Sequence, residues 1–399
     1  MEKSVSYHSP LTRDNSNSTV SYWYLSTEAF DKKDFKNSLI NLIKYIDSTI
    51  QIPNNSGTIE IKVPHGSVEI TIKIDSDSFS VKAPFLKNPE GATALGLMRQ
   101  ISELNFSYLV LGQIFLEGTD FYFYYTDKLE NAEPYKAYAI FEEICFCADY
   151  YDDVFMDKFK TTQVNKPQIN SFSPEEKENA WKYFQEIIKE ASSFVEYFDS
   201  RRFYGLSCDA LETAVLKLDY AISPQGLLGT KLSEVKSALY AQDSLQNISA
   251  NGKQKLLEML NYDRNKFNDD LFHPKFFIPI RKRAELPYIL SFFQKNYETI
   301  TSDMSSKAYM AASSTASFMI YDLLYKNTIP NDIRSFLTSA LEKGGGKDWK
   351  TSAEVLYGAI HKIMQLDPES NEPIQLGDGS SQNISVKSIF GKITGLFKK

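Results

Sequence analysis

"TALGLMRQISELNFSYLVLGQIFLEGTDFYFYYT" (residues 93–126) passes from the apolar spacing of a helix to the apolar spacing of strands. Its first part repeats apolar residues at three- and four-residue steps, which predicts a helix with one apolar face. These residues are Ala94, Leu97, Met98, Ile101 and Leu104. Residues 107–117 and 121–126 then predict two strands around the turn EGTD. No acid, base or nucleophile in the stretch has a partner, so it predicts binding rather than catalysis.

The flanking segments complete the pattern of an α+β domain. Residues 22–50 predict a helix with a single apolar stripe, and residues 134–160 predict another. Three short segments between them alternate apolar and polar residues and predict strands. These segments are residues 59–63, 68–74 and 79–83. The order helix, three strands, helix, two strands, helix over residues 21–160 therefore predicts an antiparallel sheet with one solvated face.

The second half of the chain is typical of an all-helical domain. Residues 161–173 are polar and predict a linker. Ser173, Pro174 and Glu176 match a capping box with proline at the first helical position. Apolar periodicity then predicts helices over residues 174–364, without a strand pattern or a repeat of fixed period. The expected helices are residues 174–197, 204–220, 231–241, 252–270, 281–299, 304–326, 331–343 and 348–364.

Both ends of the chain are expected to be loosely attached. Residues 1–20 are rich in Ser and Asn and predict a flexible N-terminus, and residues 365–385 predict a flexible linker. Residues 386–399 combine an apolar helical face with four lysines, which predicts a short basic amphipathic tail. This tail has three alternative docking places: a groove on a partner, the body of the protein itself, or an anionic membrane surface. Its anchors would be Ile389, Phe390, Ile393 and Phe397.

Composition narrows the class of protein. Apolar residues make up 42% of the chain, enough for two buried cores, and the aromatic, Asn, Lys and Ile usage is typical of AT-rich bacterial coding. The net charge of −7, without a basic domain, argues against nucleic acid as a partner. Three cysteines and the lack of a long apolar run predict a cytoplasmic protein. If the tail instead binds a membrane surface, the protein is expected to lie peripherally at the inner membrane.

The sequence shows no recognisable catalytic, cofactor or metal motif. Its four histidines are isolated, and Cys145 and Cys147 lie two residues apart in a predicted helix, where they point to different faces. No catalytic, cofactor-binding or metal-binding residue is therefore predicted, and the expected function is non-enzymatic. The enzyme alternative is a site in the helical domain at which His273 or His361 lies beside a carboxylate in a polar pocket.

Two groups of residues are candidates for a protein-binding surface. Asp149, Asp153 and Asp157 share one face of a predicted helix. Such a face is expected to be solvated and able to attract basic segments of a partner, whereas paired carboxylates could instead serve as acid and base. Tyr122 and Tyr124 point to one side of their strand. They are expected either under the helical domain or on an open surface that binds an extended peptide.

The same motifs carry a family resemblance. The element order over residues 22–160 resembles that of type III secretion chaperones and the related YbjN-like bacterial proteins. The most specific match is a Leu-rich helix that ends in Asn-Phe before a strand with a glycine. The matching residues are Leu97, Leu104, Asn105, Phe106, Gly112 and the strand from Phe121. The resemblance implies an acidic, homodimeric, chaperone-like adaptor that binds an extended segment of a client protein for a bacterial secretion or injection system. It does not extend to the larger helical half.

Overall fold

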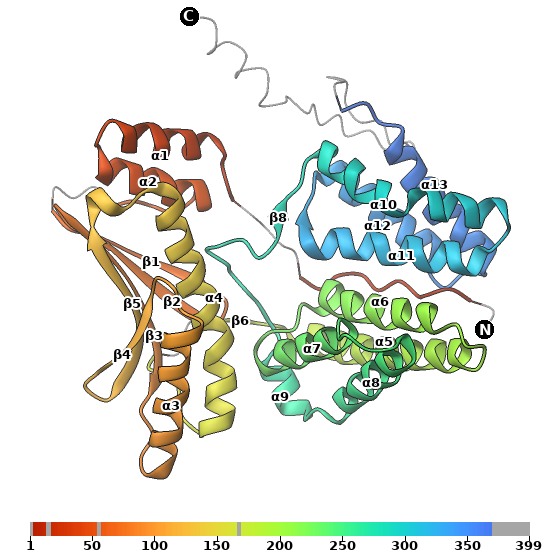
Figure 1. Cartoon of the computed structure of the whole chain (residues 1–399), viewed down its shortest axis with the longest axis horizontal. Coiled ribbons are helices and arrows are strands. Elements are labelled where there is room, and N and C mark those ends of the chain that lie inside the picture. The colour runs from red at the N-terminus through yellow and green to blue at the C-terminus, as the bar shows by residue number, and fades with distance from the viewer. Residues whose placement is uncertain (1–2, 13–16, 54–56, 166–168, 369–399) are drawn as a thin grey trace, which may run out of the picture.

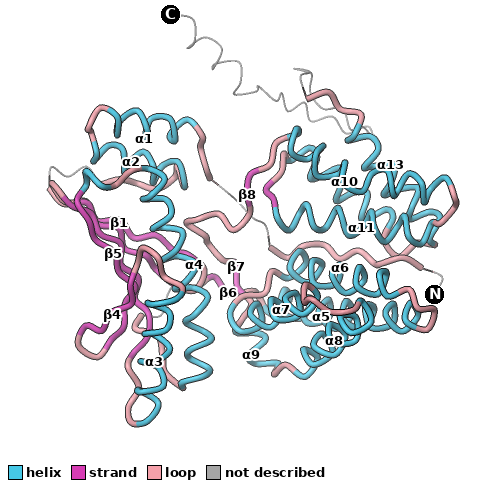
Figure 2. The backbone as a smooth tube through the Cα atoms, viewed as in Figure 1, coloured by secondary structure: helices cyan, strands magenta, loops and turns pink. Residues whose placement is uncertain are grey.

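The computed structural model of the chain describes residues 3–12, 17–53, 57–165 and 169–368 (Figure 1). An α+β domain lies beside a larger helical half. Within the described residues, strands longer than two residues occur only in the α+β domain (Figure 2). The fold class expected from the sequence is therefore confirmed. No described helix is both long and apolar enough to cross a membrane.

The sheet of the α+β domain is antiparallel and has the strand order β1-β2-β3-β5-β4. Its strands are β1 (Ile59–His65), β2 (Val68–Ile74), β3 (Ser78–Lys87), β4 (Gln113–Glu117) and β5 (Asp120–Lys128). The alternation of apolar residues sets the register, because Ile72 lies opposite Ile61 on one side and opposite Val81 on the other. Apolar side chains thus share one face, and polar side chains such as Lys62 share the other.

Helices pack against the apolar face of the sheet. They are α2 (Phe35–Ile46), α3 (Ala92–Ser107) and α4 (Pro134–Phe159), and α4 contacts four of the five strands. A further helix, α1 (Ser21–Asp31), packs on α2. The single helix expected over residues 22–50 is wrong, because Lys33 has a φ of 62° and Asp34 caps a new helix. The strand expected from residue 107 begins only at Gln113, because α3 continues to Ser107.

The helical half contains two groups of helices, each with its own core. The first group is α5 (Pro174–Asp199), α6 (Tyr204–Ile222), α7 (Gly226–Leu239), α8 (Leu245–Glu258) and α9 (Arg264–Asp269). The second group is α10 (Leu286–Ser305), α11 (Tyr309–Lys326), α12 (Asn331–Gly344) and α13 (Trp349–Met364). The expected capping box between Ser173 and Glu176 is present. Two pairs of short strands connect loops of the helical half. Each strand has two residues, which is too few for an alternation of apolar and polar residues to be seen in the sequence. They are β6 (Asn170–Ser171) with β7 (Phe272–His273), and β8 (Lys282–Arg283) with β9 (Asn327–Thr328).

Residues 3–12, here called the N-terminal strap, lie between the two groups of helices. The Ser4 N–H donates to the Lys347 carbonyl at 2.7 Å, and the Leu11 N–H donates to the Ala221 carbonyl at 2.9 Å. The expectation of a flexible N-terminus is therefore wrong for these residues. The polar composition of these residues does not indicate that their hydrogen-bond partners lie hundreds of positions later in the chain.

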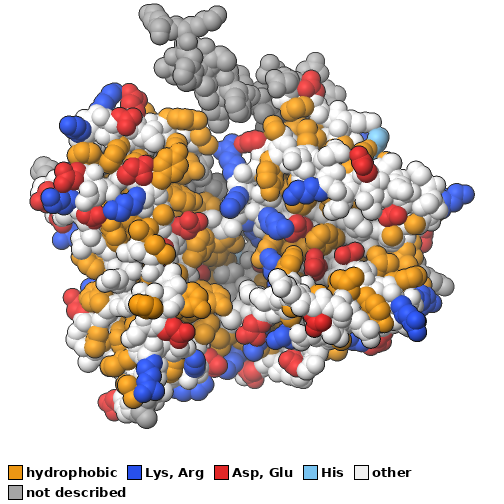
Figure 3. All heavy atoms as spheres, viewed as in Figure 1, with side chains coloured by type: hydrophobic (Ala, Val, Ile, Leu, Met, Phe, Trp, Pro, Cys, Tyr) orange, Lys and Arg blue, Asp and Glu red, His pale blue; other side chains and the backbone are white. Residues whose placement is uncertain are grey.

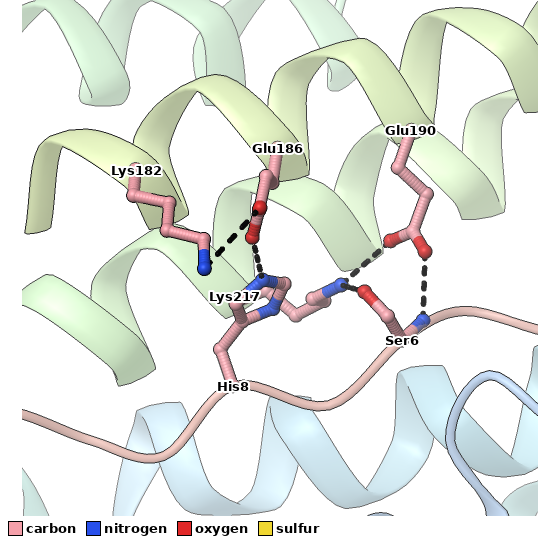
Figure 4. Close-up of polar contacts among 6 residues, drawn as sticks. All are labelled: Ser6, His8, Lys182, Glu186, Glu190 and Lys217. Carbon is pink, nitrogen blue, oxygen red and sulfur yellow. Dashed lines mark hydrogen bonds and ion pairs between the residues drawn. The ribbon is translucent and has the colours of Figure 1, made fainter. Parts of the chain in front are cut away.

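Polar side chains fix the middle of the strap (Figure 4). The Ser6 N–H donates to the Glu190 carboxylate at 2.8 Å, and the buried Lys217 ammonium donates to the same carboxylate at 2.7 Å. His8 Nε2 lies 3.2 Å from a carboxylate oxygen of Glu186. The strap therefore joins α5 and α6 through buried polar contacts as well as through its backbone.

A loop of the helical half also crosses into the α+β domain. The Gly66 N–H donates to the Lys275 carbonyl at 2.9 Å, and the Phe277 N–H donates to the Pro64 carbonyl at 3.1 Å. Phe277 and Ile278 are buried in the core of the sheet. This loop therefore covers the end of the β1 edge and ties the two halves together.

The segment expected to be a linker, residues 161–173, is partly paired with β3. The Lys87 N–H donates to the Thr162 carbonyl at 2.9 Å, and the Val164 N–H donates to the Phe85 carbonyl at 3.0 Å. Its start therefore belongs structurally to the α+β domain.

Candidate protein-docking surface

Tyr122 and Tyr124 lie on the polar face of the sheet, on the side away from α4 and the helical half. Both rings are half-buried, whereas Phe123 between them is buried on the opposite face. The Lys82 ammonium lies 4.0 Å from the centroid of the Tyr122 ring, and the Phe115 and Tyr124 ring centroids are 5.3 Å apart. These tyrosines were expected either under the helical domain or on an open surface, and the structure places them on the open face of the sheet. Their role in binding stays a prediction.

A more exposed apolar surface lies at the end of α3 and in the connection that follows it to β4. Residues 106–110 are here called the apolar loop. Phe106 is 92% exposed, Tyr108 is 60% exposed and Val110 is 85% exposed, whereas Leu109 is buried in the core of the α+β domain. A cluster of large apolar side chains in solvent marks an interaction site more often than an isolated exposed residue does.

Glu143 of α4 holds the end of the apolar loop. Its carboxylate accepts the N–H groups of Val110 at 2.7 Å, Leu111 at 3.0 Å and Gly112 at 2.6 Å. Successive backbone N–H groups that converge on one anion form a nest, which fixes the backbone around it. A side chain at Gly112 would come within 3.2 Å of Ile144, so a glycine suits this close approach. The end of the loop is therefore anchored at its backbone, while the side chains of Phe106, Tyr108 and Val110 are exposed to solvent.

Asn105 anchors the other side of the same connection. Its side-chain oxygen accepts the Ile114 N–H and its amide donates to the Ile114 carbonyl, both at 2.7 Å. These contacts occupy outward-facing backbone groups of β4, an edge strand that would otherwise be open to pairing with another chain. Both backbone groups of Ile114 are therefore already paired and are not open to the addition of a strand.

The sequence does not predict a binding role for the apolar loop, although Phe106 belongs to the motif that carries the resemblance. A strand starting at residue 107 would have buried every second side chain of this segment. Residues 108–111 are instead four consecutive apolar residues, a pattern that a half-buried strand does not show. That run, directly after a helix ending in Asn-Phe, is the signal that could have identified the loop.

The prediction that Asp149, Asp153 and Asp157 form a solvated acidic face on α4 is wrong for two of these three residues. Asp149 and Asp153 are half-buried, because α4 lies between the sheet and the helical half. Asp149 accepts the Ser67 N–H at 2.6 Å and the Ser67 hydroxyl at 2.9 Å, and burial raises its pKa. Only Asp157 is exposed, and it pairs with the Lys266 ammonium at 3.3 Å. These aspartates contact the protein itself rather than forming an open surface for a basic partner.

A cleft of about 470 Å³ lies between α4 and the helical half. Phe146, Tyr150 and Tyr151 line it from α4, and Lys236 and Tyr325 line it from the helical half. Figure 3 shows a hollow between the two halves, with apolar side chains along its borders. The Lys236 ammonium lies 4.0 Å from the centroid of the Tyr325 ring. The volume is in the range of small-ligand sites, and a position between domains is a common one for such sites.

The two histidines of the enzyme alternative are not among the residues that line this cleft. His273 Nε2 lies 3.2 Å from a Glu176 carboxylate oxygen, in the β6–β7 pair. His361 stacks on Tyr357 and is hydrogen-bonded to the Tyr297 hydroxyl. Among the residues that the structure describes, no group of three or more His, Cys, Asp or Glu side chains is placed to hold a metal ion.

The remaining candidates lie in the C-terminal tail. Ile389, Phe390, Ile393 and Phe397 are outside the described residues, and their role stays a prediction from the sequence. In comparisons with known proteins, no family model matches the sequence and no curated protein is significantly similar to it.

Proposed function

We propose that this protein is a non-enzymatic protein-binding module, an adaptor or chaperone-like component, and that the apolar loop is its docking surface. One observation carries this proposal: Phe106, Tyr108 and Val110 are exposed on a backbone that Glu143 and Asn105 hold in place. The resemblance of the α+β domain to secretion chaperones supports the same role, with a client or component of a bacterial secretion or injection machine as the partner.

The energetics favour docking through these side chains. Burial of an exposed Phe or Val side chain contributes on the order of 1.5–3 kcal/mol. Because the loop backbone is already fixed, binding loses less conformational entropy than it would with a mobile loop. Arg99, Glu103 and Glu117 are exposed nearby in the sequence. An apolar centre with polar residues around it is the usual composition of a protein–protein interface.

The same geometry limits the kind of partner. The partner should present an apolar pocket or groove for Phe106 and Val110. The half-buried row of Tyr122 and Tyr124 offers a second, flatter contact on the open face of the sheet. A partner that reached both surfaces would contact the α+β domain without contacting the helical half.

Site-specific photo-crosslinking in the native cell tests the proposal. The full chain would carry p-benzoylphenylalanine in place of Val110 and, in a matched control, in place of Leu245 of α8, which is 53% exposed. We expect one protein to crosslink at position 110 and not at position 245, and Phe106→Asp to abolish that product. The absence of a product at position 110, or the same products at both positions, would contradict the proposal.

The identity of the product separates the possible occupants. A product with twice the mass of the chain would identify a second copy as the partner, in line with the homodimer that the resemblance implies. Crosslinked peptides from residues 386–399 of the same chain would assign the loop to the tail, and would overturn its role in binding another protein.

A further inference from the structure

Two carboxyl groups from different halves of the molecule meet at the start of α7. Gly226 is the first residue of α7 and has a φ of 55°. A Cβ built on it would lie 2.6 Å from Asp270 Oδ1 and 3.1 Å from Asp153 Oδ2. Asp153 belongs to α4 of the α+β domain, and Asp270 follows α9 of the helical half. The two carboxyls therefore face the same point of the contact between the halves.

Asp270 is held by its own half of the molecule. It accepts the Tyr262 hydroxyl at 2.7 Å and the Leu228 N–H at 3.0 Å. It thus caps the first turn of α7 and cannot turn away from Asp153 without leaving those N–H and O–H groups unpaired. Its place at the contact is fixed by the fold of the helical half.

Asp153 belongs to a carboxyl cluster on α4. Its neighbour Asp152 is buried and accepts the Ser67 hydroxyl and the Gln163 amide, both at 2.6 Å. Asp149 also accepts from Ser67. In the described part of the chain, no Lys, Arg or His forms an ion pair with any of these carboxyls or with Asp270, although Lys266 pairs with Asp157 close by. The elements packed here carry further titratable or charged side chains. They are Tyr150, Tyr151, Asp157, Lys158 and Lys160 at the C-terminal end of α4, Lys231, Glu234 and Lys236 on α7, and Tyr262, Arg264, Lys266 and Asp269 on or before α9.

The charge state of this contact depends on pH. Burial raises the pKa of Asp153 to about 7, with the Asp270 charge acting in the same direction, and burial raises the pKa of Asp270 to about 6. Both groups are thus more easily charged when the halves separate than when they are in contact. The contact is therefore at full strength below about pH 4, the ordinary value for an Asp carboxyl, and weakens as pH rises through about 6 to 7.

We propose that Asp153 and Asp270 form a pH-sensitive latch between the α+β domain and the helical half, closed while the carboxyls are protonated and loosened when both are charged. Opening would move α4 away from α7 and widen the cleft that Asp149 and Gly226 line. The proposal does not depend on the apolar loop, because none of its residues belongs to that loop, and it adds a regulatory property to the protein.

Hydrogen–deuterium exchange of the full chain at pH 5 and pH 8 tests the latch. After correction for the intrinsic pH dependence of exchange, we expect peptides covering residues 226–232 and 149–157 to exchange at least ten times faster at pH 8. A single carboxyl that releases its proton on opening changes the opening equilibrium by up to about tenfold per pH unit in this window. In Asp153→Asn, which has nearly the same shape and cannot ionise, we expect this difference to become smaller, because only Asp270 still titrates at the contact.

Two further variants make the result decisive. Asp270→Asn should reduce the same pH difference, and it provides the test if Asp153→Asn does not fold at either pH. Asp157→Asn is the matched control one turn further along α4. Its carboxyl pairs with Lys266, which lowers its pKa, so this variant should keep the pH difference. Equal exchange of the wild-type protein at the two pH values, or an unchanged difference in Asp153→Asn and Asp270→Asn, would overturn the proposal.

Discussion

The ammonium of Lys217 lies 2.7 Å from the carboxylate of Glu190, where the N-terminal strap crosses α5 and α6. Burial alone would raise the pKa of Glu190, but the attraction of Lys217 and the hydrogen bonds from Lys217 and Ser6 lower it. Burial lowers the pKa of Lys217, against the attraction of Glu190. The close contact and the shared donor from Ser6 favour an ion pair. This pair joins three segments that are far apart in the sequence.

Removal of the Lys217 ammonium should destabilise the helical half. Lys217→Met keeps the length of the side chain but leaves the Glu190 charge without its partner, which costs about 3 kcal/mol or more in comparable buried pairs. Lys253→Met is the control, because it breaks an exposed pair with Glu196 whose ions are 3.0 Å apart, and such pairs contribute less than about 1 kcal/mol. Urea unfolding followed by circular dichroism measures both. Similar losses in the two variants would contradict a special role for Lys217.

The strap should loosen in acid because of His8. Burial lowers the pKa of the His8 imidazole, and the nearby Lys217 charge acts in the same direction, whereas Glu186 opposes both. A histidine of this kind stabilises the fold fully above its ordinary pKa of about 6.5. That contribution is lost as pH falls through the lower value in the folded protein, by at most about 1.4 kcal/mol per pH unit.

His8→Gln tests this pH dependence. Glutamine keeps a group that can donate to Glu186 but does not titrate, so the variant should lose less thermal stability than the wild-type protein between pH 7 and pH 5. The Asp153–Asp270 contact changes in the opposite direction over the same range, but it is the same in both proteins and cancels in the comparison. Parallel curves for the two proteins would show that His8 does not titrate in this range.

The sheet could be predicted from the sequence because its signal is local. Ile59, Ile61 and Val63 alternate with charged residues, and one buried face requires that alternation. The N-terminal strap could not be predicted in the same way. Ser4 and Leu11 have no periodic pattern, and their partners Lys347 and Ala221 are brought to them only by the folded helical half.

For the candidate surfaces, too, features set by neighbouring residues could be predicted, whereas contacts with residues far away in the sequence could not. Alternation along β5 correctly separated Tyr122 and Tyr124 from the buried Phe123. Helical spacing correctly placed Asp149 and Asp153 on one side of α4, but it gave no information about what packs there. Asp149 packs against Gly66 and Ser67 of the β1–β2 turn, and Asp153 packs against Gly226, which the helical half supplies.

Loss of the Glu143 carboxylate should release the apolar loop. In Glu143→Ala the N–H groups of Val110, Leu111 and Gly112 lose their common acceptor, and we expect a loss of about 1–3 kcal/mol in stability. Exchange of the amides of residues 110–112 should become faster, and the crosslinked product at position 110 should decrease. Glu142→Ala is the control, because the side chain of Glu142 is exposed. Unchanged exchange in Glu143→Ala would contradict the anchoring role of this carboxylate.

A methyl group at Gly66 should be far more destabilising than one at another left-handed glycine. Gly66 has a φ of 57°, and a Cβ on it would overlap the Asp149 carboxylate, so Gly66→Ala must both strain the turn between β1 and β2 and displace Asp149 from Ser67. Gly118 has a φ of 64° in the turn between β4 and β5 and no atom within 4 Å of the Cβ position. Gly118→Ala therefore measures the backbone strain alone, about 1 kcal/mol. We expect Gly66→Ala to cost at least about 2 kcal/mol more in urea unfolding, because the displaced carboxylate loses hydrogen bonds at a half-buried position. Equal costs at the two glycines would show that Asp149 moves aside freely, and that the contact between α4 and the β1–β2 turn adds little to the stability of the fold.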